Sequence, residues 1–145
     1  MTKSKEDKNL KRVRKFVEDL RFMFDVSMYE INIFSKNEDE EKGDQIIEAT
    51  IEVDEKYQTI HIDIYPIFFK RNLENQRKTL LHEMCHILNT PLQEIAESLL
   101  AGKLVTEDLI SAASEKATSR MENIIDALLK NRLTYAKDAY KDYLK

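Results

Sequence analysis

Residues that break regular backbone structure are rare in this chain, and their scarcity limits the folds open to it. The 145 residues include only 2 Gly and 2 Pro. Gly and Pro mark turns, helix ends and irregular loops, so their near absence excludes a loop-rich or low-complexity protein. We therefore expect a chain dominated by helices with short connections.

The length and composition fit one soluble domain over residues 1–145. The chain is 42% hydrophobic with a formal net charge of −4, which is enough apolar material for one compact core. The charged N-terminus lacks the apolar core of a signal peptide, and no stretch approaches the roughly 18 apolar residues of a membrane span. The single Cys85 cannot form an internal disulfide. These features predict a cytoplasmic protein with no membrane partner.

Apolar periodicity predicts an α+β fold. We expect a first helix over about residues 6–24, three strands at 28–34, 45–53 and 58–66, a mostly apolar helix with one polar stripe around residue 82, and further helices. The acidic run 37–44 has the polarity of an exposed turn. A long helix of roughly 25 residues should follow Thr106, and the tail 134–145 either continues it or docks separately.

Thr90 and Pro91 mark a boundary between two helices in this interpretation. Thr90 suits an N-cap, Pro91 suits the first helical position, and Gln93 completes a capping box. We therefore predict that one helix ends at Asn89, that a second begins at Thr90, and that Gly102 ends the second.

The motif that carries chemistry is His82-Glu83-Met84-Cys85-His86, an HExxH sequence. On a helix its two imidazoles stand one turn apart and can both bind one zinc ion at about 2.0–2.1 Å. Glu83 then lies beside a zinc-bound water and can act as general base. Cys85 falls at the border of the polar stripe, so we expect it to pack and not to bind metal.

The surrounding helix positions support a metal site. Asn75, Thr79 and Asn89 share the side of a helical wheel that holds both histidines, whereas the opposite arc is apolar. A helix so apolar should be buried, and zinc would offset the desolvation of its polar stripe. The alternative is a partly exposed helix whose histidines hydrogen-bond to backbone or water.

The stretch TIHIDIYPIFFKRNLENQRKTLLHEMCHILNTPL resembles the strand-then-HExxH-helix unit of zincin metallopeptidases. It is most similar to the small metallopeptidase-like proteins of phages and prophages, and the resemblance covers about residues 45–133. In those relatives a later helix supplies a glutamate as third zinc ligand. Residues 115–121, EKATSRM, match that helix with Thr118 in place of an aliphatic residue, so the resemblance implies Glu115 as the ligand.

Other third ligands remain open. Asn89 and Leu92 stand where metzincins need Gly and His, so a three-histidine site would require His61. Glu122 lies one heptad after Glu115 on the same side of the last helix. The remaining acidic candidates, Glu94 and Glu97, are more easily interpreted as the solvated face of a short helix.

The resulting hypothesis is a gluzincin-type zinc peptidase: His82, His86 and Glu115 bind Zn²⁺, and Glu83 is the catalytic base. The resemblance further implies that residues 60–65 form the cleft edge that binds a peptide or protein substrate. The residues considered for oxyanion stabilisation are Arg120, His61, Tyr135, Tyr140 and Tyr143.

The alternative function is a catalytically silent, metal-stabilised phage or prophage protein that binds or regulates a host protein in the host cytoplasm. Glu83 would then do no chemistry. The net charge of −4 and the lack of a basic patch interleaved with aromatic residues argue against nucleic acid as a partner of either kind of protein.

Overall fold

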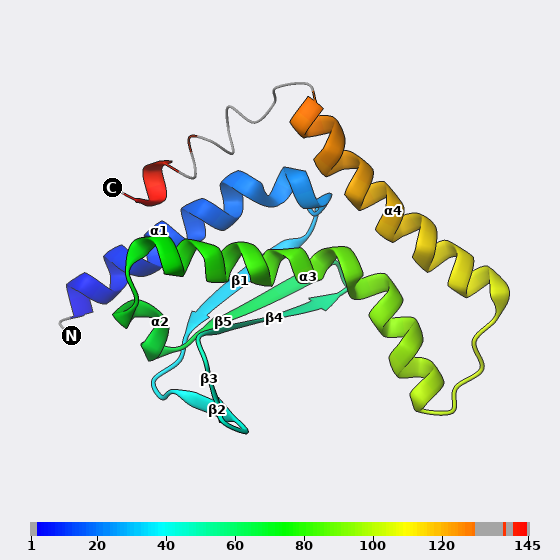
Figure 1. The fold of residues 1–145 in the computed structure, drawn as a ribbon, viewed down its shortest axis with the longest axis horizontal. Helices are drawn as coiled ribbons and strands as arrows, with labels where there is room; N and C mark the ends of the chain where they lie inside the picture. Colours follow the sequence, from blue (N-terminus) through cyan, green and yellow to red (C-terminus); the bar gives the residue numbers. More distant parts are fainter. Residues whose placement is uncertain (1–2, 130–137, 139–140, 145) are drawn as a thin grey trace.

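The computed structural model describes residues 3–129, 138 and 141–144, and its fold is α+β as predicted (Figure 1). A helix precedes a small sheet, and two long helices follow it. The elements are α1 (Lys3–Leu20), η1 (Arg21–Phe24), β1 (Glu30–Ser35), β2 (Glu40–Lys42), β3 (Gln45–Ile47), β4 (Ala49–Asp54), β5 (Thr59–Ile64), α2 (Pro66–Lys70), α3 (Leu73–Leu100) and α4 (Glu107–Leu129).

The main sheet has three strands in the order β1-β5-β4, which confirms the small predicted sheet. β5 lies in the middle, parallel to β1 and antiparallel to β4. The acidic run is exposed, as expected, and its residues 40–42 also form strand β2 of a separate antiparallel hairpin with β3. Gly43 lies in its turn with a φ of 63°, a value that glycine adopts without strain.

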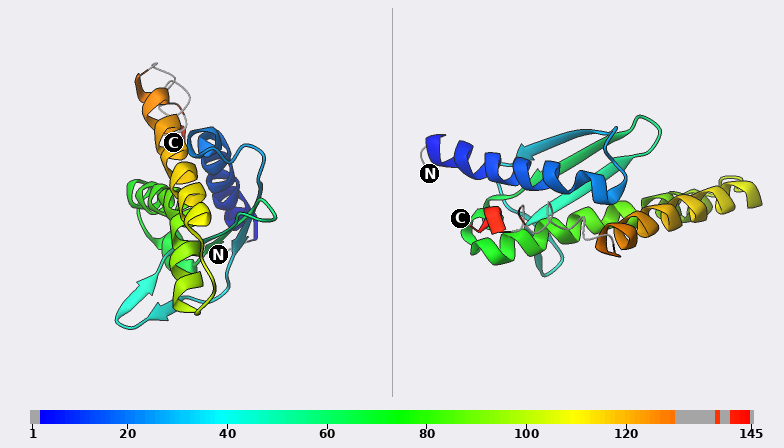
Figure 2. Two further views of the ribbon diagram at one scale, coloured as in Figure 1. Left: turned by 90° about the vertical axis from the view of Figure 1, so that its right-hand side faces the viewer. Right: turned by 90° about the horizontal axis from the view of Figure 1, so that it is seen from above.

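The core lies between one face of the main sheet and the helices α1, η1 and α3 (Figures 1 and 2). β5 alternates buried and more exposed residues, as a strand with one covered face must. The buried side chains of this layer include Val13, Val17, Phe24, Ile60, Ile62, Ile64, Leu80, Met84 and Ile87. Because Leu80, Met84 and Ile87 of α3 are buried in this layer, they fix the rotation of the helix and therefore the direction in which the HExxH side chains point.

The predicted helix boundary at Thr90 is wrong, because α3 runs unbroken from Leu73 to Leu100 with Pro91 inside it. Pro91 has no N–H to donate to the Ile87 carbonyl, which normally bends or ends a helix. Here Nη1 of Arg120, on α4, donates to that carbonyl at 2.8 Å. Thr90 does not cap a new helix; its hydroxyl donates to the His86 carbonyl at 3.1 Å. The helix therefore continues beyond Pro91, and it bends in its second half (Figure 1).

The end of α3 and the start of α4 agree with the sequence. α3 ends at Leu100, and Gly102 follows with a φ of 67°. The Thr106 hydroxyl accepts a hydrogen bond from the Leu109 backbone N–H at 3.3 Å, which is the expected cap of α4. Within the described part of the chain, no helix combines the length and apolar character needed to cross a membrane.

Residues 141–143 are helical, and Tyr143 docks against the body of the protein. Its ring packs edge-on against Phe16 of α1 at 5.1 Å between centroids, and its hydroxyl donates to Oε1 of Gln76 on α3 at 3.0 Å. The C-terminal segment therefore docks at Tyr143. Tyr135 and Tyr140, two of the residues considered for the oxyanion, lie outside the described residues.

Candidate metal centre

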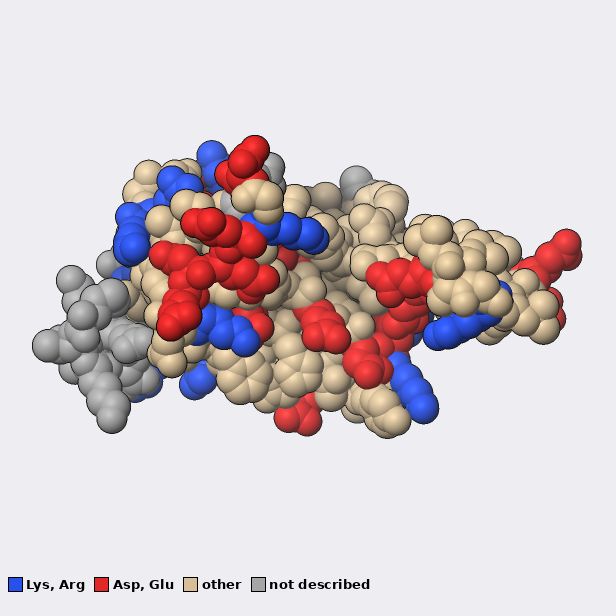
Figure 3. Space-filling view, turned by 90° about the horizontal axis from the view of Figure 1, so that it is seen from below, with Lys and Arg blue, Asp and Glu red and all other residues tan. Residues whose placement is uncertain are grey.

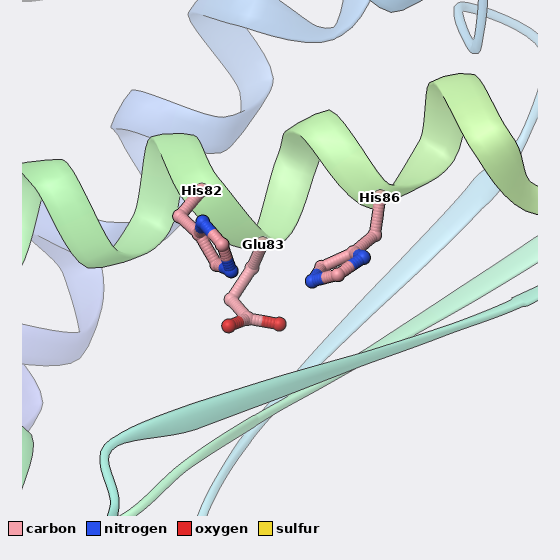
Figure 4. Close-up of side chains that lie close together, drawn as sticks. All are labelled: His82, Glu83 and His86. Carbon is pink, nitrogen blue, oxygen red and sulfur yellow. The ribbon is translucent and has the colours of Figure 1, made fainter.

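His82, Glu83 and His86 come together on α3. One possible ligand atom from each lies within 4.8 Å of the others. The two imidazole centroids are 4.9 Å apart with an interplanar angle of 89°. All three side chains leave the same side of the helix and point toward the strands (Figure 4). The helical spacing thus produces the arrangement that the sequence predicts.

The polar stripe is not buried, contrary to expectation. His82 and His86 are exposed and Glu83 is half-buried, because the side of α3 that holds Leu80, Met84 and Ile87 faces the core instead. The imidazoles are therefore open to an ion without any movement of the fold.

Cys85 is also exposed, so the expectation that it packs in the interior is wrong. The residue is still partly covered by its neighbours, and this desolvation raises the pKa of its thiol above the ordinary value. Since a thiol binds metal only as the thiolate, this shift disfavours Cys85 as a ligand.

Glu83 has the electrostatic character of a proton acceptor. Its burial raises the pKa of the carboxyl, and this effect exceeds the opposing influence of His86, His82 and a backbone hydrogen bond with Ile51. A carboxylate with a raised pKa is a stronger base, provided that it is ionised at the working pH.

A cleft of about 420 Å³ runs from the motif along α3. β4 borders one side, and in the described chain β4 pairs only with β5, so its outer edge carries no further strand, although the backbone of Ile51 hydrogen-bonds to Glu83. The cleft is lined by Ile51, Glu52 and Val53 of β4 and by Glu83, His86, Thr90, Gln93, Glu94 and Glu97 of α3. The expectation that residues 60–65 form this edge is wrong, because β5 is paired on both sides.

The third ligand is not among the groups that the described structure brings together. Glu115 and Glu122 are exposed on α4 and lie outside the group of His82, Glu83 and His86. Glu115 as third ligand stays a prediction.

The other proposed ligands are poorly placed. Glu94 and Glu97 line the cleft, but at 1.5 Å per residue they lie about 12 and 16 Å beyond His86 along the helix. His61 is exposed and stacks on Phe34 at 6.1 Å, on the face of the sheet opposite to the buried Ile60 and Ile62. A three-histidine site is therefore contradicted.

The oxyanion candidates that the structure describes have other roles. Arg120 is fully buried and donates to Glu55, Tyr29 and the Ile87 carbonyl. Tyr143 is buried between α1 and α3. His61 lies on the far face of the sheet, so none of the three is assigned to the oxyanion.

Sequence reasoning missed the buried network around Arg120. Its members are Tyr29, just before β1, Glu55, in the turn after β4, and Lys116, on α4. Glu55 looks like an ordinary turn residue, and no periodic pattern links it to α4. The one usable signal was an arginine at position 120 within a helix that has to pack.

The donor set suits zinc, since imidazole nitrogens with a nearby carboxylate are ligands that Zn²⁺ prefers and an open side leaves room for water. No family model, curated protein or solved structure matches this chain. The chemistry of the site therefore rests on its geometry.

Proposed function

We propose that this chain is a zinc-dependent metallopeptidase in which His82 and His86 hold the metal and Glu83 is the general base. One observation carries the proposal: two imidazoles and a half-buried carboxylate lie within 4.8 Å of one another, and two of these groups, Glu83 and His86, line a cleft beside the edge strand β4. This arrangement offers metal ligands, a base and a place for an extended peptide at one point.

Each part of the chain has a defined task in peptide hydrolysis. Zinc, when bound, polarises the scissile carbonyl and acidifies a water molecule. Glu83 accepts the proton of that water and delivers it to the leaving amine. The free edge of β4, from Ile51 to Val53, holds the substrate backbone by strand addition, and its side chains exclude water from one wall of the cleft.

The alternative is a metal-stabilised binding protein without catalysis. It draws support from the small number of ligands in the described group. That group contains the two histidines and Glu83, and no further metal-binding side chain joins them there. In that case Glu83 has no chemical role. Replacing Glu83 separates the two functions.

The test compares native protein with Glu83→Gln at matched zinc occupancy on a peptide library. Glutamine keeps the size of the side chain but cannot accept the proton, so turnover should fall by about 10²–10⁴ while folding and zinc content persist. His82→Ala and His86→Ala serve as controls that should lose zinc as well. Equal turnover of native and Glu83→Gln protein removes Glu83 from the mechanism and favours the binding protein.

A further inference from the structure

A buried arginine joins the HExxH helix to the rest of the molecule directly beside the motif. Arg120 is 0% exposed, and its Nη1 donates to the Ile87 carbonyl at 2.8 Å and to Oε1 of Glu55 at 2.6 Å. Its Nη2 hydrogen-bonds to the Tyr29 hydroxyl at 3.1 Å. The guanidinium therefore links α3, α4 and the turn after β4.

The Ile87 carbonyl needs this donor because Pro91 removes the one that a regular helix would supply. A helical carbonyl accepts from the N–H four residues later, and position 91 has none. Ile87 is also 1% exposed, so water is a poor substitute there, and a buried carbonyl without a donor is costly. The break at Pro91 and the arginine on α4 thus form one structural unit.

This unit acts on the backbone next to a proposed metal ligand. Ile87 follows His86 directly, and the His86 carbonyl accepts a hydrogen bond from Thr90, the residue before Pro91. The turn that carries His86 is therefore held at two successive carbonyls. A shift of this turn would move the His86 imidazole relative to His82.

We propose that Arg120 is the positioning residue of this site: it fixes the α3 turn that carries His86, and Glu55 holds Arg120 in place. The proposal rests on the proposed function, since it takes His86 to be a zinc ligand. Arg120 does not touch the metal or the substrate; it acts through the Ile87 carbonyl.

Lys116 provides a matched control within the same network. It hydrogen-bonds to Glu55 and Tyr29, as Arg120 does, but the α3 backbone is not among its hydrogen-bond partners. If Arg120 only attached α4 to the rest of the protein, replacing Arg120 and replacing Lys116 would change the zinc affinity to a similar extent. A positioning role requires that only Arg120 affects the metal site.

The experiment measures zinc affinity by competition with a chelator for native protein, Arg120→Lys and Lys116→Met. Lysine keeps the charge beside Glu55 but has no fork to reach Ile87 at the same time, so affinity should fall by about tenfold. Lys116→Met should stay within about twofold of native. Native affinity in Arg120→Lys, or equal losses in both variants, overturns the proposal.

Adding Pro91→Ala to Arg120→Lys gives the decisive readout. Alanine restores an N–H that can donate to the Ile87 carbonyl, so zinc affinity should recover in the double variant. A structural role of Arg120 elsewhere would not respond to this change. Absence of recovery, with Pro91→Ala alone binding zinc normally, contradicts the proposal.

Amide hydrogen exchange on metal-free protein separates this inference from the proposed function. Exchange of the amides from residue 86 to residue 90 should accelerate in Arg120→Lys and slow again when Pro91→Ala is added. That pattern in a protein that binds no zinc would defeat the peptidase proposal but preserve the support of the helix by Arg120. Zinc binding and turnover in the native protein without that pattern would defeat the positioning role alone.

Discussion

Glu55 lies in the turn between β4 and β5, and its carboxylate joins segments that are distant in the chain. It forms ion pairs with Arg120 and Lys116 of α4 and accepts a hydrogen bond from the hydroxyl of Tyr29. Burial by itself raises the pKa of Glu55, but the hydrogen bonds from Arg120, Lys116 and Tyr29 and the charge of Arg120 together lower it by more, so the net shift is downward. Glu55 therefore remains ionised in the folded protein.

Replacing this carboxylate should destabilise the protein at neutral pH. Glu55→Gln leaves the buried Arg120 without its countercharge, which costs about 3–5 kcal/mol in the free energy of unfolding. Chemical denaturation at pH 7 measures the change. The exposed Glu41→Gln, in the β2–β3 hairpin, is the control and should stay within about 0.5 kcal/mol of native.

The same carboxylate sets a pH dependence. Because its pKa is lower in the folded than in the unfolded state, its contribution is complete above the unfolded value of about 4.3 and is lost as the pH falls through the folded value. The stability difference between native protein and Glu55→Gln should therefore shrink in acid. A difference that stays constant from pH 7 to pH 3 would show that the pKa of Glu55 is the same in the folded and unfolded states.

Glu115 is the residue expected to complete the proposed zinc site. If Glu115 is the ligand, Glu115→Gln should weaken zinc binding strongly, because a neutral amide neither completes the coordination nor offsets the dication's charge. Glu122→Gln should matter less. Zinc titration of both variants decides, and a larger loss in Glu122→Gln would assign the ligand one heptad later.

Among the elements, α3 shows why a local rule failed. Thr90, Pro91 and Gln93 match a helix start, and nothing nearby in the sequence speaks against it. The donor that lets the helix pass Pro91 is Arg120, which lies 33 residues from its acceptor Ile87. Capping rules consider only adjacent residues, so they cannot include a donor from another helix.

The docking of the C-terminal residues 141–143 through Tyr143 should contribute to the stability of the fold. Tyr143→Phe removes the hydrogen bond to Gln76 but keeps the contact with Phe16, so it should cost about 1 kcal/mol in unfolding free energy. Tyr143→Ala also loses the packing and should cost about 3–5 kcal/mol. Thermal and chemical unfolding measure both. Tyr57→Phe, at an exposed position, is the control, and equal effects at both sites would mean that residues 141–143 do not dock.

Over the whole molecule, local sequence patterns predicted most helices and strands, whereas the order of the strands and the surroundings of the motif depend on contacts between distant segments. Alternation identified β4 and β5, and helical spacing identified α1 and α4, whereas it divided α3 into two helices at Thr90. The strand order did not follow, because β1 pairs in parallel with β5 across an intervening hairpin, and the free edge beside the motif therefore belongs to β4. HExxH spacing predicted the His82, Glu83 and His86 cluster because one helical turn is enough to build it, whereas a third ligand depends on long-range packing.

The charge of the molecule leads to a prediction about substrates. Acidic side chains gather on the face that Figure 3 shows, and the cleft is lined by Glu52, Glu94 and Glu97 in addition to Glu83, with no Lys or Arg among its lining residues. If the chain is a peptidase, peptides that carry Lys or Arg should have a lower KM than neutral peptides of the same length. The advantage should decrease at high salt.

Glu94→Gln combined with Glu97→Gln should remove much of that advantage. Each exposed carboxylate contributes roughly two- to fivefold in KM, and kcat should change little, because these groups lie away from Glu83. Steady-state kinetics on a basic and a neutral peptide provide the comparison. An equal rise in KM for both peptides would mean that the cleft does not select by charge.

The distance in sequence between Glu55, Ile87 and Arg120 sets an order of assembly during translation. The sheet and the HExxH helix leave the ribosome first, and at about 5–20 residues per second Arg120 follows Ile87 after a delay on the order of a few seconds. In that interval the carbonyl beside His86 and the Glu55 carboxylate both lack the arginine that satisfies them in the folded protein. If Arg120 positions this turn as proposed, a nascent chain carries its HExxH motif before it carries the residue that holds the motif in place, and the motif reaches its final geometry only after α4 has been made.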